Sequence, residues 1–296
     1  MTPGRQVTIL DGATGTELGR RGVDISLPLW STRALITAPD VLADVHRDYL
    51  DAGADAITAN TFRTHRRALA REPQAHGAPD ATELTRTAVK IAREACLKHK
   101  PGALVFGSVA PLEDCYRPDL APGADDCARE HAELIATLVE AGVDRVLIET
   151  MNNLTETRAA VAAARRLAPD RWMVSFCTDT AASPGTLLSG EPIEAILDEL
   201  GDASAVGVNC VAAPDVARQV ALLRKRLPDT VAIIAYANIG YADEHGNWVP
   251  TDAVDPDRYA DYATRWVEAG ASIIGGCCGT TPATIAAVAG RLSRAD

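Results

Sequence analysis

The sequence predicts an α/β protein with a (β/α)8 TIM barrel, a single domain over residues 1–296. Short apolar, β-branched runs alternate along the whole chain with longer stretches of helical period, a pattern typical of repeated βα units and a parallel sheet. These runs number eight, which in a chain of this length indicates a closed barrel. Because no linker rich in Gly, Ser and Pro divides the chain, we expect one domain.

The eight predicted strands are residues 7–11, 54–61, 103–109, 143–149, 172–177, 204–210, 231–237 and 272–276. Predicted helices lie between them, such as residues 39–52 and 128–141, whose apolar residues fall on one stripe. The helix-to-strand turns are short and carry glycine, at Gly53, Gly142 and Gly270, because glycine can take the left-handed conformation that ends a helix.

The strand-to-helix connections are long, notably residues 12–37, 111–126 and 239–255. Long loops at one end of the barrel indicate one functional face. In (β/α)8 barrels this face lies at the C-terminal ends of the strands. We therefore expect a site lined by the polar and sulfur side chains that end the predicted strands.

Composition excludes several classes of partner. The chain carries 40 acidic and 29 basic residues, a formal charge of -11, which argues against binding to nucleic acid or to an anionic membrane. The N-terminal apolar run at residues 7–10 is too short for a signal peptide or a membrane span. These features favour a cytoplasmic protein with small-molecule partners.

Three of the seven cysteines stand at strand ends. Cys210 closes the sixth predicted strand, and Cys277 and Cys278 follow the eighth. Alternate strands of such a barrel contribute side chains to the same interior layer, so these sulfurs can converge.

Adjacent residues of a regular strand point to opposite faces, so Cys278 can join Cys277 only if the chain bends. Gly275, Gly276 and Gly279 would permit that bend. A strained vicinal disulfide or a reactive redox pair is the alternative, but it leaves Cys210 without a role.

Three thiolates on Zn²⁺ leave a fourth position open, which is typical of a catalytic site. A substrate thiol bound there would lose its proton to become a thiolate. We expect no catalytic residue beyond this metal-bound thiolate.

The chain resembles the homocysteine S-methyltransferase family over nearly its whole length. The resemblance rests on motifs at the predicted strand ends: Asp11-Gly12-Ala13-Thr14-Gly15-Thr16-Glu17-Leu18, Asn60-Thr61-Phe62, Glu149-Thr150, Gly207-Val208-Asn209-Cys210 and Gly275-Gly276-Cys277-Cys278-Gly279-Thr280-Thr281-Pro282. It implies a zinc barrel that transfers a methyl group to the homocysteine thiolate, giving methionine.

The acceptor is an amino acid, so its ammonium needs acids and its carboxylate needs amide donors. We assign Asp11 and Glu149 to the ammonium, and the resemblance places homocysteine-binding acids at these positions. The turn that contains Gly12 and Ala13 would offer backbone N–H groups to the carboxylate. A turn-capping role for Asp11 and a barrel salt bridge for Glu149 are the alternatives.

The methyl donor would lie near aromatic residues. Trp30 aligns roughly with a donor-side tryptophan of the betaine-dependent relatives, and its π-face suits a cationic donor; core or lid packing is the alternative. Tyr236, Asn238 and Trp248 are further donor-side candidates. Asn209 would orient a neighbour of the metal through hydrogen bonds.

Three features depart from the family. Thr284 replaces a frequent histidine, at a position expected to open a helix and not to bind the metal. Residues 63–67 differ from the aromatic segment of the betaine enzymes, so we favour S-methylmethionine or S-adenosylmethionine as donor. The loop at residues 111–126 matches no named donor, and Cys115 and Cys127 are expected to be bystanders.

The alternatives are another thiol or selenol acceptor, a corrinoid protein as donor, or a non-catalytic zinc or thiol sensor. The sequence leaves the oligomeric state open.

Overall fold

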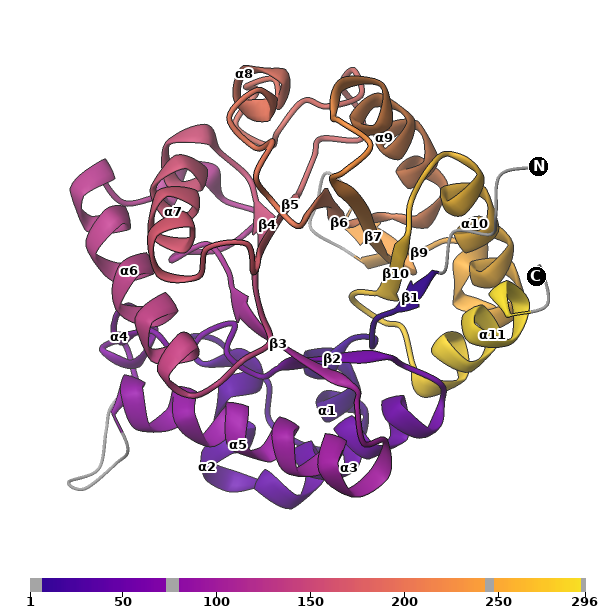
Figure 1. The fold of residues 1–296 in the computed structure, drawn as a ribbon. Helices are drawn as coiled ribbons and strands as arrows, with labels where there is room; N and C mark the ends of the chain where they lie inside the picture. Colours follow the sequence, from indigo (N-terminus) through magenta and orange to yellow (C-terminus); the bar gives the residue numbers. More distant parts are fainter. Residues whose placement is uncertain (1–6, 73–79, 243–247, 294–296) are drawn as a thin grey trace.

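The chain folds into a closed barrel of eight parallel strands surrounded by helices, as Figure 1 shows. The computed structural model describes residues 7–72, 80–242 and 248–293. Around the barrel the strands follow the order β1-β10-β7-β6-β5-β4-β3-β2, and a bridge between Leu10 and Ala56 joins β1 to β2 and closes the ring. The predicted (β/α)8 barrel is confirmed.

All eight predicted strands are present, with ends that differ by a few residues. Their bounds are β1 Thr8–Ile9, β2 Ala56–Ala59, β3 Leu104–Val109, β4 Arg145–Met151, β5 Trp172–Phe176, β6 Ala205–Ala212, β7 Ala232–Asn238 and β10 Ile273–Gly276. A separate two-stranded hairpin, β8 Gly240–Ala242 and β9 Trp248–Pro250, lies in the long loop after β7.

The helices fill the stretches between the strands. They are α1 Thr14–Arg20, α2 Arg33–Thr37, α3 Pro39–Asp51, α4 Arg66–Leu69, α5 Ala81–His99, α6 Ala124–Glu140, α7 Leu154–Leu167, α8 Glu194–Leu197, α9 Ala213–Arg226, α10 Pro256–Glu268 and α11 Pro282–Leu292. Three short 3₁₀ turns are η1 Trp30–Thr32, η2 Pro118–Leu120 and η3 Asp252–Val254. The two predicted helices correspond to α3 and α6, the latter starting earlier than expected.

Two apolar layers hold the barrel together. The larger one lies between the strands and the helices and includes Trp172, Trp266 and Tyr259, which are fully buried. The smaller one fills the barrel interior and includes Phe106, Met173 and Ile234 from three strands. Because these side chains close the interior, an open site is possible only at an end of the barrel.

The helix-to-strand turns are built as predicted. Gly53, Gly142 and Gly270 have φ values of +109°, +87° and +114°, the left-handed region that glycine adopts without a Cβ penalty. Each turn is short, so the N-terminal end of the barrel is compact. The long loops, with α1, η2 and the β8–β9 hairpin, lie at the opposite end.

The last helix begins immediately after the paired cysteines. Pro282 occupies its first turn. The Thr281 hydroxyl accepts a hydrogen bond from the Thr284 amide, and the Thr284 hydroxyl accepts one from the Thr281 amide. This capping box fixes the chain just beyond Cys278. Thr284 is therefore a helix-start residue, in agreement with the position expected for it.

None of the helices in the described ranges is both long enough and apolar enough to cross a membrane.

Candidate active site

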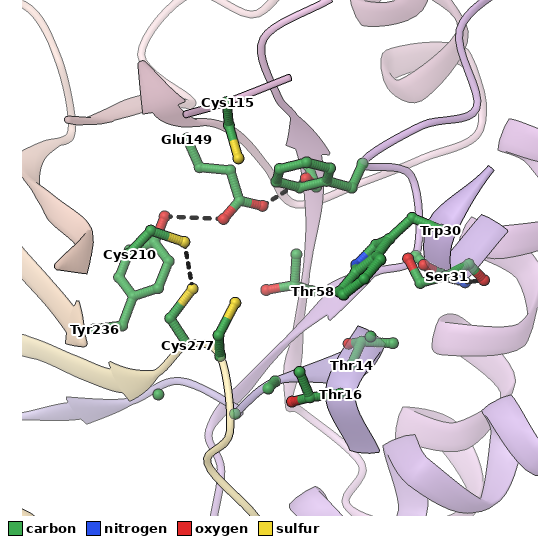
Figure 2. A pocket seen from close by; sticks show the side chains of 18 of the residues that line it. Thr14, Thr16, Trp30, Ser31, Thr58, Cys115, Glu149, Cys210, Tyr236 and Cys277 are labelled. Atoms are coloured by element: carbon green, nitrogen blue, oxygen red, sulfur yellow. Dashed lines mark hydrogen bonds between the residues drawn. The ribbon is translucent and has the colours of Figure 1, made fainter. Parts of the chain in front are cut away.

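A cavity of about 510 Å³ opens at the C-terminal end of the barrel. Its lining comes from the ends of β1, β2, β3, β4, β6, β7 and β10 and from the loops that follow them. Figure 2 shows the three kinds of group that meet there: sulfur from Cys210 and Cys277, the carboxylate of Glu149, and the indole of Trp30.

The sulfurs of Cys210, Cys277 and Cys278 converge as predicted. All three lie within 4.8 Å of one another, and the Cys210 and Cys277 sulfurs are 2.6 Å apart, longer than the ~2.05 Å of a disulfide. Three convergent cysteine sulfurs are a donor set that suits a soft or borderline metal ion. Among the residues that the structure describes, this is the one group of three with metal-ligand geometry.

The chain bends at Cys210 in a way that the sequence did not indicate. Cys210 has a φ of +55°, and the pairing of β6 with β7 shifts register between Asn209 and Ala212. The bulge turns the Cys210 side chain toward the end of β10. A non-glycine residue in this region is strained, and such strain is concentrated at functional sites.

The glycines around the cysteine pair have different roles from those predicted. Only Gly279 takes a left-handed φ, +83°, and it lies in the turn that the Thr280 amide closes on the Cys277 carbonyl at 3.1 Å. Gly275 and Gly276 are needed for close packing instead. A Cβ on Gly275 would lie 2.8 Å from the Leu10 Cβ, and one on Gly276 would lie 2.4 Å from the Thr280 hydroxyl.

Asn238, predicted to bind substrate, connects the two cysteine segments instead. Its Nδ2 donates to the Cys210 carbonyl at 2.9 Å, and its Oδ1 accepts from the Cys278 amide at 3.0 Å. It is buried and does not line the cavity. Asn238 therefore sets the spacing of the cysteines.

Asn209 is buried behind the cavity as well. Its Oδ1 accepts from the Thr150 amide at 2.9 Å, and its Nδ2 donates to the Thr150 hydroxyl at 2.8 Å. That hydroxyl in turn lies 3.9 Å from the Cys210 sulfur. Asn209 thus holds the end of β4 against β6 and supports Cys210 indirectly. This arrangement agrees with the orienting role expected from the sequence, and Asn209 does not border the cavity as a substrate-binding residue would.

Hydrogen bonds within the cluster favour a thiolate. Those from Cys210 and Cys277 lower the pKa of Cys278 well below its usual value. Cys278 therefore carries the negative charge of the free cluster, whereas its neighbours hold the pKa values of Cys210 and Cys277 above their usual range. A bound metal ion would favour the thiolate form of all three.

Asp11 lies at the end of β1 and lines the cavity. Its carboxylate accepts from the Thr58 amide at 2.8 Å and the Thr58 hydroxyl at 3.1 Å. Burial raises its pKa from 3.8 to about 8, against these hydrogen bonds. A cationic ligand group would stabilise the ionised form.

Glu149 lies across the cavity, at the end of β4. It accepts hydrogen bonds from Ser108 and, at 3.2 Å, from the Tyr236 hydroxyl (Figure 2). Burial raises its pKa from 4.5 to about 7. No basic side chain pairs with it among the residues described, so the predicted alternative of a barrel salt bridge has no support.

In the turn after β1, some backbone groups already form hydrogen bonds within the protein. The Ala13 amide donates to the Thr280 hydroxyl at 3.1 Å, and the Tyr49 hydroxyl donates to the Ala13 carbonyl at 3.0 Å. The Gly12 amide has no acceptor within the described chain, and it borders the cavity. Of the predicted pair, Gly12 is therefore the better placed to donate to a ligand.

Three aromatic side chains line the cavity, Tyr236 at its inner end beside Glu149 and Trp30 and Trp248 farther out. The Trp30 indole packs on Gly15, where an added Cβ would lie 2.3 Å from the indole nitrogen. Tyr236 lines the cavity from β7, and Trp248 of β9 is 46% exposed at its rim. All three are donor-side candidates from the sequence, and all three border the same space.

Sequence reasoning missed part of the lining. Cys115, expected to be a bystander, borders the cavity together with Tyr116, from the loop between β3 and α6; burial raises the pKa of the Cys115 thiol well above its usual value, so it stays protonated. Arg63, which follows β2, also lines the cavity. Cys127 is buried elsewhere and donates to the Pro122 carbonyl, so it remains a bystander.

Comparison with known proteins agrees with this site. A sequence model described as homocysteine S-methyltransferase matches residues 8–292. Homocysteine S-methyltransferase 1 of Zea mays is 32% identical, covering 95% of this chain and 92% of the relative. Selenocysteine Se-methyltransferase of Brassica oleracea var. italica is 31% identical, covering 96% and 88%.

A solved structure is similar as well. The metallated form of the homocysteine methyltransferase MmuM from Escherichia coli superposes with a TM-score of 0.80 at 29% identity, covering 97% of this chain and 96% of that one. The match spans nearly the whole of both chains. With the family match over residues 8–292, it shows that this chain is a methyltransferase that belongs to the homocysteine S-methyltransferase family.

Proposed function

We propose that the protein transfers a methyl group from S-methylmethionine or S-adenosylmethionine to the thiolate of homocysteine, giving methionine, with Zn²⁺ as cofactor. The observation that carries the proposal is the convergence of three cysteine sulfurs beside two buried, unpaired carboxylates in one cavity. An amino acid thiol presents the two groups that this arrangement fits, a sulfur and an ammonium.

Cys210, Cys277 and Cys278 would hold the zinc. A set of three thiolates suits a soft or borderline metal, and three protein ligands leave a position for substrate. When bound, the metal supplies a way to keep the substrate sulfur deprotonated at neutral pH. Asn238 and the bulge at Cys210 keep the sulfurs at the required spacing.

Asp11 and Glu149 would bind the homocysteine ammonium from two sides. Their carboxylates are buried and have no basic partner in the described chain, so an incoming ammonium replaces the missing cation. The free Gly12 amide would donate to the carboxylate. These contacts orient the sulfur toward the cysteines.

The donor would enter through the outer part of the cavity. Trp30 and Trp248 offer π-faces to a sulfonium cation. In the transfer, a bond forms between the homocysteine sulfur and the methyl carbon while the bond from that carbon to the donor sulfur breaks. The electron pair stays on the donor sulfur, which leaves as a neutral thioether, so no general acid is needed.

A selenol acceptor is the second candidate. The Brassica relative is named a selenocysteine Se-methyltransferase and covers nearly all of this chain. Selenium has the same preference for a soft metal site, so the two acceptors must be separated by assay.

The test begins with metal content and activity. Protein purified without oxygen is expected to hold one zinc per chain and to form methionine from homocysteine with a sulfonium donor. Betaine, a methylated corrinoid and selenocysteine are the comparison substrates. Bound zinc with no methylation of any acceptor would contradict the enzymatic role and favour a sensor.

Cys210→Ala should lower the zinc content to well below one per chain and abolish methyl transfer, because two thiolates remain. Cys96→Ala, a change of a buried cysteine in α5 far from the cavity, is the matched control and should leave both unchanged. A Cys210→Ala protein with full zinc content would disprove the three-cysteine site.

A further inference from the structure

Arg63 is the one basic residue in the described lining of the cavity. The other charged lining residues are Asp11, Asp114 and Glu149, and the cysteine cluster adds further negative charge. The charged side chains of the lining other than Arg63 therefore favour cations. A positive group at a single place in an acidic cavity indicates a specific anionic partner.

Arg63 is buried, with 7% of its surface exposed, yet no carboxylate within the described ranges forms an ion pair with it. Its hydrogen bond there is a long one, 3.4 Å from Nη2 to the Glu113 carbonyl. The Glu113 side chain does not pair with it either, because that carboxylate binds Arg67 and Arg71. A buried guanidinium without an anion is costly, so an anion supplied by a ligand would complete the site.

The position of Arg63 in the barrel separates it from the cysteine cluster, although β2 borders β1, the strand that leads to Asp11 and Gly12. Arg63 follows β2, and in the strand order β2 and β6 are four places apart, so Arg63 and Cys210 approach the cavity from opposite sides. The Gly12 amide, assigned above to the homocysteine carboxylate, belongs to the β1 turn that is tied to Thr280 beside the cysteines. Arg63 instead contacts the loop after β3.

We propose that Arg63 binds the carboxylate of the methyl donor and so selects amino acid sulfonium compounds over sulfonium compounds without a carboxylate. The inference rests on the proposed function, since it assigns the donor half of the same cavity. A guanidinium offers a planar pair of N–H donors that matches a carboxylate. With the donor held at its carboxylate end by Arg63, its sulfonium end reaches across toward the cysteines.

The test compares two ligands, S-methylmethionine and its decarboxylated analogue, which keeps the sulfonium and ammonium groups. Calorimetric titration measures binding of each to the wild-type protein and to Arg63→Gln, and so does not depend on turnover. Wild-type protein should bind S-methylmethionine more tightly than the analogue. Arg63→Gln should weaken binding of S-methylmethionine about 10- to 100-fold, the range for a lost charged hydrogen bond, and leave binding of the analogue unchanged.

Kinetics distinguish the two possible carboxylates. In Arg63→Gln we expect the KM for S-methylmethionine to rise and the KM for homocysteine to stay near the wild-type value, with partial recovery in Arg63→Lys. A rise in the homocysteine KM alone would assign Arg63 to the acceptor and overturn the proposal. Equal losses of binding affinity for S-methylmethionine and for the analogue in Arg63→Gln would mean that Arg63 only supports the fold.

Arg71→Gln is the matched control for loop movement. Arg71 binds the same Glu113 from the protein surface and does not line the cavity. Arg71→Gln should still bind S-methylmethionine more tightly than the analogue. Loss of this preference in Arg71→Gln would assign it to the position of the loop and contradict a direct contact between Arg63 and the donor. If wild-type protein binds S-methylmethionine but transfers no methyl group, the proposed function fails and the Arg63 assignment stands.

Discussion

Glu149 shows how one side chain can make binding depend on pH. Burial raises its pKa to about 7 in the free protein, yet an ammonium ligand needs its ionised form. The KM for homocysteine should therefore fall as the pH rises through about 7. Glu149→Gln removes the charge and keeps the shape, so we expect its homocysteine KM to be about tenfold higher or more and to lose this part of the pH dependence.

Steady-state kinetics between pH 6 and pH 8.5 measure this effect. Glu156→Gln is the control, because Glu156 is also buried but lies outside the cavity, against His131. The homocysteine KM of Glu156→Gln and its pH profile should match those of the wild type. A Glu149→Gln enzyme with the same homocysteine KM and pH profile as wild type would remove Glu149 from the acceptor site.

Residue types at strand ends predicted the cysteine cluster, Asp11 and Glu149, because sulfur and acids are unusual at the ends of apolar strands. The sequence could not show where Asn238 points, since one extra residue in the β6 bulge decides which groups face the cavity. Arg63 was missed for a similar reason: whether an arginine is paired depends on neighbours from other elements.

At the scale of elements, Asn238 joins three segments: its own strand β7, the bulge of β6 at Cys210 and the turn after β10 at Cys278. Asn238→Ala leaves the Cys278 amide and the Cys210 carbonyl without this partner. We expect a loss of about 1–3 kcal/mol in the free energy of unfolding and a metal affinity about 10- to 100-fold lower.

Competition with a chelator measures the metal affinity, and denaturant unfolding measures the stability. Asn153→Ala is the control, because Asn153 is a buried asparagine that caps α7 away from the cysteines. It should cost about 1 kcal/mol of stability and leave metal affinity unchanged. Equal metal affinity in both variants would contradict the spacing role of Asn238.

The regular elements were predictable to within a few residues because a buried parallel strand is a continuous apolar run. The elements that were missed lie in the long loops. Helix α1 is a single short element with few apolar residues, and the β8–β9 strands have three residues each, so neither has a detectable period. The long loops supply Trp30, in η1, and Trp248, in β9, to the site.

Asp11, in the proposed ammonium site, lowers the stability of the whole molecule when the pH is above its solvated pKa. Asp11 has a pKa of 3.8 in a solvated chain and about 8 in the fold, because burial disfavours its charge. Between these values the folded protein binds more protons than the unfolded chain, so the free energy of unfolding contributed by Asp11 falls as the pH rises. This contribution is fully present only below the lower value.

Asp11→Asn removes this titration and keeps both contacts to Thr58, since an amide can accept from the Thr58 amide and donate to its hydroxyl. Calorimetry should show that the melting temperature of the variant exceeds that of wild type by a few degrees at pH 8, with a smaller difference at pH 5. Comparing the two proteins cancels the titration of the cysteines. Homocysteine should stabilise wild type much more than the variant at pH 8, because its ammonium pairs only with the ionised Asp11. A difference in melting temperature that does not change with pH would mean that Asp11 is already ionised in the folded protein without ligand. The titration of Asp11 would then not lower the stability.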